Sequence, residues 1–238
     1  FLNTLPFIYG LKKSKLINSI NLELDYPSVC AKKLINKEVD LALVPVAIIP
    51  RLKNKFIISE YCIGAVGAVG TVCLYSNVPF FEIESISLDY QSLTSVELLK
   101  ILLNEYWGIF PEIRKANIGF EENINGNHAA LVIGDRAFNL NTKYDYIYDL
   151  SAIWNEMTGL PFVFAVWVAN QKLSNYFISN FNQALKSGLS NINAAVELEK
   201  ANYPYCRDPK DYLNNKISYN FDTEKKRGMD LFFSKLNI

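Results

Sequence analysis

The run GLPFVFAVWVA at residues 159–169 has no charged side chain, and only a glycine and a proline interrupt its apolar character. Eleven residues are too few to cross a membrane as a helix. Pro161 also prevents the helix-like segment before it from continuing. A strand that is apolar on both faces has to be covered on both faces by other elements. The run therefore predicts a buried strand inside a layered α/β protein.

Short runs rich in valine and isoleucine alternate with helix-like segments along the rest of the chain. Strands are predicted at 20–26, 39–49, 56–61, 68–76, 85–89, 117–120 and 129–134. Helices are predicted at 94–107, 150–159, 171–188 and 190–202, with Gly188 as the break between the last two. This alternation indicates an α/β fold with largely parallel sheets.

The length of 238 residues and the absence of a Gly/Ser-rich linker favour two lobes joined by strands that pass between them. We expect the chain to leave the first lobe near 78–80 and to return near 166–168. Lobe one then comprises 1–77 and 168–238, and lobe two comprises 78–167. A ligand cleft is expected between the lobes, near Gly70 and Asp135.

Charge and composition argue against several classes of protein. Lysine plus arginine equals aspartate plus glutamate at 24 each, so no basic surface for a nucleic acid is predicted. The densest positive run, EKKRG at 224–228, is expected to begin a solvated helix. The uncharged stretch 61–81 contains three glycines and Pro79, which favour strands and a loop over a membrane span.

The cysteines and the single histidine do not suggest a metal site. The four cysteines form no CxxC pair, and His128 has no cysteine or histidine at the spacing of a zinc site. We expect reduced thiols, no metal, and a solvent-exposed loop position for His128. No export signal is recognisable, so a cytoplasmic location is expected.

Two segments early in the chain combine small polar residues with a turn. In FLNTLPF, Asn3 and Thr4 precede Pro6 and could present an amide and a hydroxyl to a cleft, although an ordinary turn explains the same residues. In GAVGAVGTV, Gly70 would let a ligand approach the backbone and Thr71 adds a hydroxyl. The spacing fits neither a phosphate loop nor a dinucleotide fingerprint, and close packing explains it equally well.

Two later segments could hold an anion. In LDYQSLTSVELL, Thr94 with Glu97 matches the capping-box pattern, and the hydroxyls of Ser92, Thr94 and Ser95 surround a helix start suited to a carboxylate. A capped helix that binds nothing is the alternative. In LVIGDRAF, a buried strand ends at Gly134, so Asp135 and the arginine after it are expected at a sheet edge where ligands bind, or in an internal ion pair.

Taken in order, these segments and the apolar run resemble the chorismate dehydratase family of the futalosine route to menaquinone. The resemblance covers nearly the whole chain, and LNTLPF, IGDRA and TGLPFVFAVW are its most specific parts. It implies a two-lobed fold like that of type 2 periplasmic solute-binding proteins, with a ligand cleft between the lobes. It also implies loss of water from chorismate to give 3-[(1-carboxyvinyl)oxy]benzoate without a cofactor, and a short strand ahead of LNT that would precede Phe1.

The resemblance also implies site residues. Asn3 matches an active-site residue through LNTLP, and Thr71 stands where the family usually has serine, so the hydroxyl is retained. Asn3, Thr71 and Asp135 are the catalytic candidates. The substrate-binding candidates are Thr4, Pro45, Gly70, Ser92, Thr94, Ser95 and Gly134. Either Asp135 assists the proton transfer, or the enolpyruvyl carboxylate of the substrate itself accepts the proton.

Two other functions stay open at this stage, because a fold does not settle a function. One is a solute-binding protein that binds a small carboxylate unchanged, and the other is dihydroxynaphthoate synthase, a later enzyme of the same pathway. For a chorismate dehydratase we expect chorismate as the small-molecule partner, no nucleic acid and no membrane, and we allow for a homodimer. Turnover of chorismate would distinguish a dehydratase from a solute-binding protein.

Overall fold

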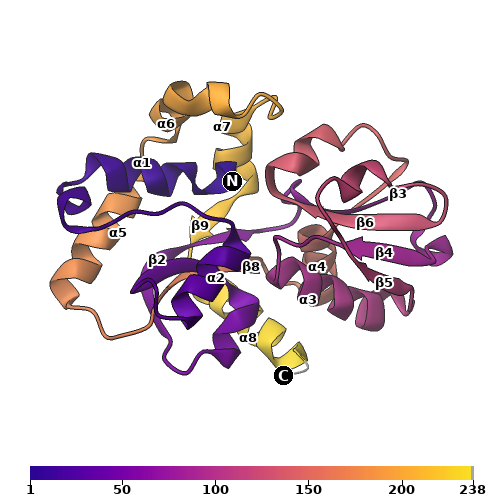
Figure 1. Ribbon diagram of the computed structural model, residues 1–238, viewed down its shortest axis with the longest axis horizontal. Coiled ribbons are helices and arrows are strands. Elements are labelled where there is room, and N and C mark those ends of the chain that lie inside the picture. The colour runs from indigo at the N-terminus through magenta and orange to yellow at the C-terminus, as the bar shows by residue number, and fades with distance from the viewer. Residues whose placement is uncertain (237–238) are drawn as a thin grey trace.

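Two β-sheets, one in each half of the molecule, organise the chain (Figure 1). The computed structural model describes residues 1–236. The first sheet has the strand order β1-β8-β2-β9 and the second has the order β5-β4-β6-β3-β7. The strands are β1 (Leu41–Pro45), β2 (Phe56–Ala65), β3 (Val72–Ser76), β4 (Ser85–Leu88), β5 (Glu112–Lys115), β6 (His128–Ile133), β7 (Tyr146–Asp149), β8 (Phe162–Ala169) and β9 (Ser218–Asn220).

The expectation of largely parallel sheets is wrong. Every ladder of the first sheet is antiparallel, and in the second sheet only the pairs β4–β5 and β4–β6 are parallel. Strand β8 enters the first sheet from the second half of the molecule and lies between β1 and β2, antiparallel to both. Apolar side chains on both faces show that a strand is covered, and they carry no information on its direction.

Helices cover the outer faces of both sheets (Figure 1). They are α1 (Leu5–Lys13), α2 (Pro27–Ile35), α3 (Thr94–Leu102), α4 (Leu150–Thr158), α5 (Asn175–Leu189), α6 (Ile192–Glu199), α7 (Pro209–Asp211) and α8 (Thr223–Lys235). Short 3₁₀ turns are η1 (Leu2–Thr4), η2 (Lys15–Ser19), η3 (Val46–Arg51), η4 (Phe80–Glu82), η6 (Phe120–Glu122), η7 (Gly134–Asn139) and η8 (Lys200–Asn202), and π-helical turns are η5 (Leu103–Trp107) and η9 (Tyr212–Lys216). Within residues 1–236, none of these helices has the length and apolarity needed to cross a membrane.

The helix predictions hold for the four segments that were identified. Helix α3 and the π-helical turn after it cover 94–107, and α4 ends at Gly159, whose φ of 71° is the left-handed conformation that favours glycine. Gly188 does not break the chain as expected, because it lies inside α5. Helices α1 and α2 were not predicted.

Two of the predicted strands are absent from the ladders. Residues 20–26 form no strand, because no strand of the described chain pairs with them. The segment 117–120 is a turn, and β5 forms just before it, at Glu112–Lys115. The edge strands β7 and β9 are short and were not recognised from their sequences.

The chain crosses between the sheets at other positions than expected. Strand β3 ends before the expected outgoing crossing at 78–80, yet it already belongs to the second sheet. Most of β8 lies before the expected return at 166–168, yet it already belongs to the first sheet. The outgoing crossing is therefore 66–71, and the return is 159–161. The expected crossings at 78–80 and 166–168 are therefore wrong. Strand pairing decides to which sheet β3 and β8 belong, and the apolar character of a segment does not reveal its pairing partner.

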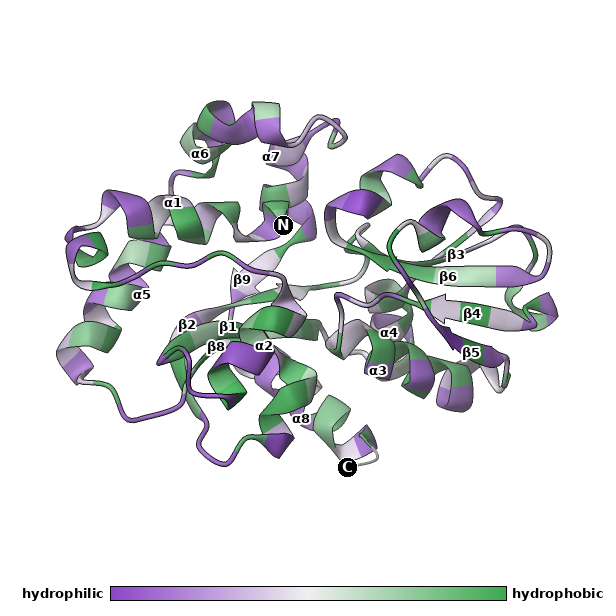
Figure 2. Cartoon of the chain, in the orientation of Figure 1, coloured by the Kyte–Doolittle hydropathy of each residue, from purple (hydrophilic) through white to green (hydrophobic). Residues whose placement is uncertain are grey.

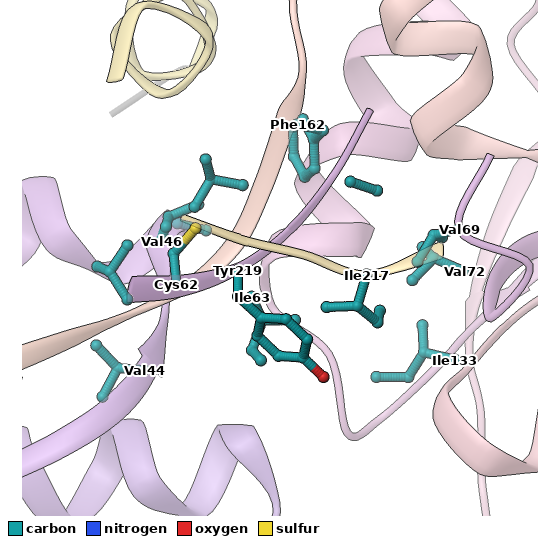
Figure 3. Close-up of a cluster of buried hydrophobic side chains, with 14 of the residues drawn as sticks. Val44, Val46, Cys62, Ile63, Val69, Val72, Ile133, Phe162, Ile217 and Tyr219 are labelled. Atoms are coloured by element: carbon teal, nitrogen blue, oxygen red, sulfur yellow. The ribbon is translucent and has the colours of Figure 1, made fainter. Parts of the chain in front are cut away.

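One buried cluster connects the two sheets. It includes side chains of the first sheet, such as Val44 and Cys62, and side chains at the start and end of second-sheet strands, such as Val72 and Ile133. Figure 3 shows Ile217 between these two groups. Strands β2 and β8 are mostly hydrophobic, whereas the edge strand β5 is hydrophilic (Figure 2). Burial of the apolar strands therefore holds both halves to one core.

The charged run 224–228 begins a helix, as predicted, but it is not fully solvated. Asp222 caps α8 by accepting a hydrogen bond from the Lys225 backbone N–H at 2.9 Å. The Lys225 side chain is only 2% exposed and its Nζ lies 2.9 Å from Asp222 Oδ2. The ion pair removes the cost of leaving that ammonium group unpaired in the core.

Helices α1 and α5 approach closely at two glycines. A Cβ on Gly188 would lie 1.9 Å from the Pro6 carbonyl oxygen, and a Cβ on Gly10 would lie 2.1 Å from the Ala184 carbonyl oxygen. Both obstacles are backbone atoms, so the helices would have to separate to admit a side chain. This contact fixes the position of α1, and with it the turn η1 that precedes α1.

We expect Gly188→Ala to lower the free energy of unfolding by about 2 kcal/mol, since overpacking at a tight contact exceeds the gain in helix propensity. Urea unfolding followed by circular dichroism measures the change. Ser187→Ala is the matched control, because Ser187 is the exposed neighbour in the same helix. An unchanged or higher urea midpoint for Gly188→Ala would contradict the close approach of the two helices.

Candidate active site

A cavity of about 630 Å³ opens between the two sheets. This volume lies within the range of small-molecule sites. Eight of the ten predicted site residues line it, and they come from both halves of the chain: Asn3, Thr4, Pro45, Thr71, Ser92, Thr94, Ser95 and Gly134. Gly70 and Asp135 are not among the lining residues.

The apolar part of the lining belongs to the core that joins the sheets. Ile63, Val69 and Ile217 line the cavity and lie close together in Figure 3. A second part of the cavity extends below the segment 19–25 toward β1 and α5. The predicted residues gather in the first part, between the sheets.

The start of the chain brings Asn3 to the cavity through η1, the turn before α1. The Asn3 carbonyl oxygen accepts a hydrogen bond from the Tyr219 hydroxyl at 2.9 Å, which fixes the backbone and leaves the side-chain amide on the cavity wall. The Thr4 hydroxyl donates to the Phe1 carbonyl at 2.9 Å. Its hydrogen is therefore engaged, and only its oxygen lone pairs are free for a ligand.

Thr71 lies at the end of the crossing 66–71 and is almost fully buried at 1% exposure. Its Oγ1 is 2.8 Å from the Tyr212 hydroxyl, and its carbonyl oxygen accepts the Gly134 N–H at 2.8 Å. Burial raises the pKa of Tyr212 above its usual value, while the hydrogen bonds it shares with the side chains of Thr71 and Asn3 act in the opposite direction. Tyr212 is thus a neutral phenol at the back of the site.

The start of α3 presents hydroxyls to the cavity in a different way from the one predicted. Thr94 does not cap the helix, because its hydroxyl donates to the Phe164 carbonyl at 3.1 Å and accepts from the Ala47 N–H at 3.2 Å. The N-cap residue is Leu93, and Ser92, just before it, accepts the Ser95 N–H with its Oγ at 3.0 Å and so satisfies one N–H group of the first turn. The hydroxyl of Ser95 lines the cavity and forms no side-chain hydrogen bond within the described residues.

Two predicted residues serve the backbone instead of the cavity. Both carboxylate oxygens of Asp135 accept the Leu2 N–H, at 3.0 and 3.2 Å. Burial raises the pKa of Asp135, and the hydrogen bond from Leu2 opposes this shift. The N–H of Gly70 donates to Asp149 Oδ2 at 2.6 Å. Both residues therefore hold the cavity wall in place from behind.

The arginine after Asp135 belongs to an internal ion pair. Arg136 Nη2 lies 2.6 Å from Asp89 Oδ2, and its guanidinium lies over the rings of Tyr90 and Phe120 at 5.2 and 5.5 Å. Burial raises the pKa of Asp89, and the charge of Arg136 opposes this shift. Of the two alternatives considered for this strand end, the internal ion pair is the correct one for Arg136.

His128 takes no part in the cavity. It begins β6, is half-buried, and its ring nitrogens lie 2.7 Å from Ser85 Oγ and 3.0 Å from Ser87 Oγ. The expected position in an exposed loop is therefore wrong. Burial lowers the pKa of this imidazole, which keeps it neutral near pH 7.

Few charged side chains border the cavity between the sheets. The lining lysines, Lys12 and Lys33, belong to its other part, and Lys33 is paired with Glu23 and Asp25 at 2.6 Å each. Next to the predicted residues lies Glu199, whose Oε2 accepts a hydrogen bond from the Asn202 amide at 2.6 Å. Anion binding in this part therefore depends on neutral donors.

Tyr203, Tyr212, Tyr219 and Glu199 were not identified from the sequence. All four lie in the C-terminal part of the chain, far in sequence from Asn3 and Thr71. No local pattern distinguishes them from ordinary core tyrosines or a surface glutamate. Only the return of this part of the chain to the first sheet brings them to the site.

Comparison with known proteins assigns the chain to a family. A family model described as menaquinone biosynthesis matches residues 1–237. The chain belongs to this family. A chorismate dehydratase of Campylobacter jejuni is 28% identical over 242 residues, covering 98% of this chain and 92% of that protein. A chorismate dehydratase of Thermus thermophilus is 27% identical over 193 residues, covering 73% of this chain and 70% of that protein.

Solved structures show which fold the chain has. The protein AF1704 of Archaeoglobus fulgidus superposes with a TM-score of 0.72 at 13% identity, covering 98% of this chain and 92% of that one. The periplasmic aliphatic sulphonate binding protein SsuA of Escherichia coli superposes with a TM-score of 0.57 at 14% identity, covering 98% and 84%. The predicted two-lobed fold, like that of periplasmic solute-binding proteins, is confirmed.

Proposed function

We propose that this member of the menaquinone biosynthesis family is a chorismate dehydratase, which removes water from chorismate to give 3-[(1-carboxyvinyl)oxy]benzoate. The observation that carries the proposal is the match of the whole chain to the family, with relatives of that name aligned over most of its length. The cavity between the sheets is of a size for such a substrate. A biosynthetic role favours the cytoplasm, and assembly as a homodimer stays a prediction.

Chorismate carries two carboxylates, and the proposed site meets them with neutral donors. Asn3, Thr94 and Ser95 at the start of α3 all line the same cavity. A helix start favours a negative charge, and hydroxyl and amide donors orient carboxylate oxygens. These groups would hold the dianion without a lysine or arginine next to the reacting ring.

The elimination breaks the C–H bond at a ring carbon and the C–OH bond at its neighbour, and the electron pair of the C–H bond becomes a ring double bond. The proton and the hydroxyl leave as water, and the ring becomes aromatic. Because aromaticity favours the product, positioning contributes more than a strong base does. Asp135, Asp149 and Asp89 do not line the cavity, and each is engaged by a backbone N–H group. Glu199 does line it, and its carboxylate accepts a hydrogen bond from the Asn202 amide. We therefore assign the proton acceptor to the enolpyruvyl carboxylate of the substrate.

Incubation of the purified protein with chorismate tests the proposed function. Formation of the aromatic product, followed by its absorbance and by mass spectrometry, is the expected result. Binding of chorismate without any turnover would favour a solute-binding role, which the fold also serves in other proteins. Neither binding nor turnover would overturn the proposal.

Two serines at the start of α3 should separate binding from stability. We expect Ser95→Ala to weaken chorismate binding by about 1–2 kcal/mol, the contribution of one hydrogen bond to a charged group, with little change in stability. Ser92→Ala is the matched variant, and it should lower the free energy of unfolding by about 1 kcal/mol because it removes the hydrogen bond to the Ser95 N–H. Isothermal titration and thermal unfolding measure the two effects. Equal losses of binding and stability in Ser95→Ala would mean that its hydroxyl only supports the fold.

Asn3 is proposed to orient the substrate through its amide, which can donate and accept but cannot act as a base. We expect Asn3→Ala to lower kcat/KM by an amount equivalent to about 2–4 kcal/mol, as for other positioned donors. Asn3→Asp should lower it at least as much, because it places a negative charge opposite an anionic substrate. Steady-state dehydration measures both variants, with circular dichroism as the folding control. Near-normal turnover by folded Asn3→Asp would contradict the orienting role.

The assignment of the proton acceptor predicts that no carboxylate of the protein is essential. Glu199→Gln and Asp135→Asn keep the hydrogen-bond acceptors of both side chains but cannot accept the proton at neutral pH. We expect each variant to keep more than about a tenth of kcat, whereas removal of a general base costs about 100-fold or more. A loss of that size in either variant, with chorismate binding intact, would make that residue the base.

A further inference from the structure

Tyr212 lies behind the site and does not line the cavity. It begins the π-helical turn η9 in the C-terminal part of the chain, and it is 5% exposed. Its hydroxyl is 2.8 Å from Oγ1 of Thr71, which does line the cavity. The ring packs edge-on against Phe138 of η7, with ring centroids 5.1 Å apart. The side chain is therefore held at both ends, with its hydroxyl aimed at Thr71.

The chemistry of the two hydroxyls indicates the direction of the hydrogen bond between them. Each group has one hydrogen to donate. The phenol of Tyr212 is neutral across ordinary pH because burial raises its pKa. Within residues 1–236, Thr71 Oγ1 at 2.8 Å is the closest recorded partner of that hydroxyl, and the Asn3 side chain also interacts with it. A phenol is also a stronger donor than an aliphatic alcohol, so Tyr212 donates and Thr71 accepts.

We propose that Tyr212 is a positioning residue for the dehydration: its phenol donates to Thr71 Oγ1 and so directs the Thr71 hydroxyl hydrogen into the cavity, toward an oxygen of the substrate. This inference rests on the proposed function. Two hydroxyls in series polarise one another, so the hydrogen that Thr71 presents to the substrate becomes a better donor. Tyr212 thereby acts on the substrate through Thr71 without touching it.

Tyr219 makes a similar contact with Asn3, the other polar residue at the centre of the site. Its hydroxyl donates to the Asn3 carbonyl oxygen at 2.9 Å. The two tyrosines follow one another along the C-terminal part of the chain, and each contacts one of the two polar residues at the centre of the site. Tyr212 differs in that its hydroxyl engages a side chain that faces the cavity, so its loss should alter catalysis more than it alters the fold.

Tyr212→Phe tests the proposal, because it keeps the ring against Phe138 and removes only the hydroxyl. We expect kcat for chorismate to fall about tenfold to 100-fold, less than for loss of a donor that itself contacts a reacting oxygen. The melting temperature should change little. Tyr144→Phe is the matched control, since the Tyr144 hydroxyl donates to the Glu121 carbonyl at 3.1 Å and Tyr144 does not line the cavity. It should keep the activity of the unmodified protein.

A double-mutant cycle separates positioning from a structural role. In a Thr71→Val background, Tyr212→Phe should change kcat by less than about twofold, because the two residues act as one unit. Thr71→Ser keeps the hydroxyl and should stay dependent on Tyr212. Equal losses from Tyr212→Phe with and without the Thr71 hydroxyl would overturn the inference.

Two outcomes distinguish this inference from the proposed function. If the unmodified protein does not convert chorismate, the proposed function fails. If it does and folded Tyr212→Phe matches it in kcat, only the role of Tyr212 fails. Should Tyr212→Phe not fold, Thr71→Val alone tests the same link, since full kcat in that variant would overturn the inference.

Discussion

The arrangement of the molecule depends on the burial of β8 between β1 and β2. This strand is apolar through its whole length and pairs antiparallel with both neighbours. Exposure of its side chains to water would be unfavourable, so the chain that leaves the first sheet has to return into its middle. The segment that forms the second sheet therefore lies in the sequence between two crossings, 66–71 and 159–161. The proposed site lies beside the first of them.

The cavity owes its neutral character to carboxylates that are engaged elsewhere. Asp149 accepts the N–H of Gly70 and also caps α4, and Asp135 accepts the N–H of Leu2. Asp89 holds Arg136 away from the cavity in a buried ion pair. These charges fix the cavity wall from behind, so the side chains that face the substrate are mainly hydroxyls and an amide. Such a surface suits a reaction that needs an oriented dianion more than it needs a strong base.

The relation to solute-binding proteins is consistent with this chemistry. The protein SsuA, which shares the fold, is an aliphatic sulphonate binding protein. A binding cleft becomes catalytic when its contacts fit the transition state better than the substrate. In the proposed dehydratase, that difference would come from the Thr71 hydroxyl and from the tyrosine behind it.

Much of the fold follows from local patterns in the sequence. The apolar run 159–169 predicts a buried strand, and Gly159 with Pro161 predicts the end of the helix before it. The helix over 94–107 and the hydroxyls at its start are equally readable, because amphipathic spacing and capping residues act over a few positions. The motifs LNTLPF and TGLPFVFAVW suffice to suggest the family to which the chain belongs.

Only the tertiary structure decides which polar groups remain free. Thr94 looks like a helix cap in sequence, but its hydroxyl is taken by Ala47 and Phe164, which lie 47 and 70 positions away. Asp135 is a catalytic candidate in the sequence, and in the structure its carboxylate accepts the N–H of Leu2, 133 positions away. Tyr212 meets Thr71 across 141 positions. The sequence by itself determines the buried strand at 162–169, the helix over 94–107 and the family, because those depend on neighbouring residues. The availability of each hydrogen bond depends on partners that only the folded chain brings together.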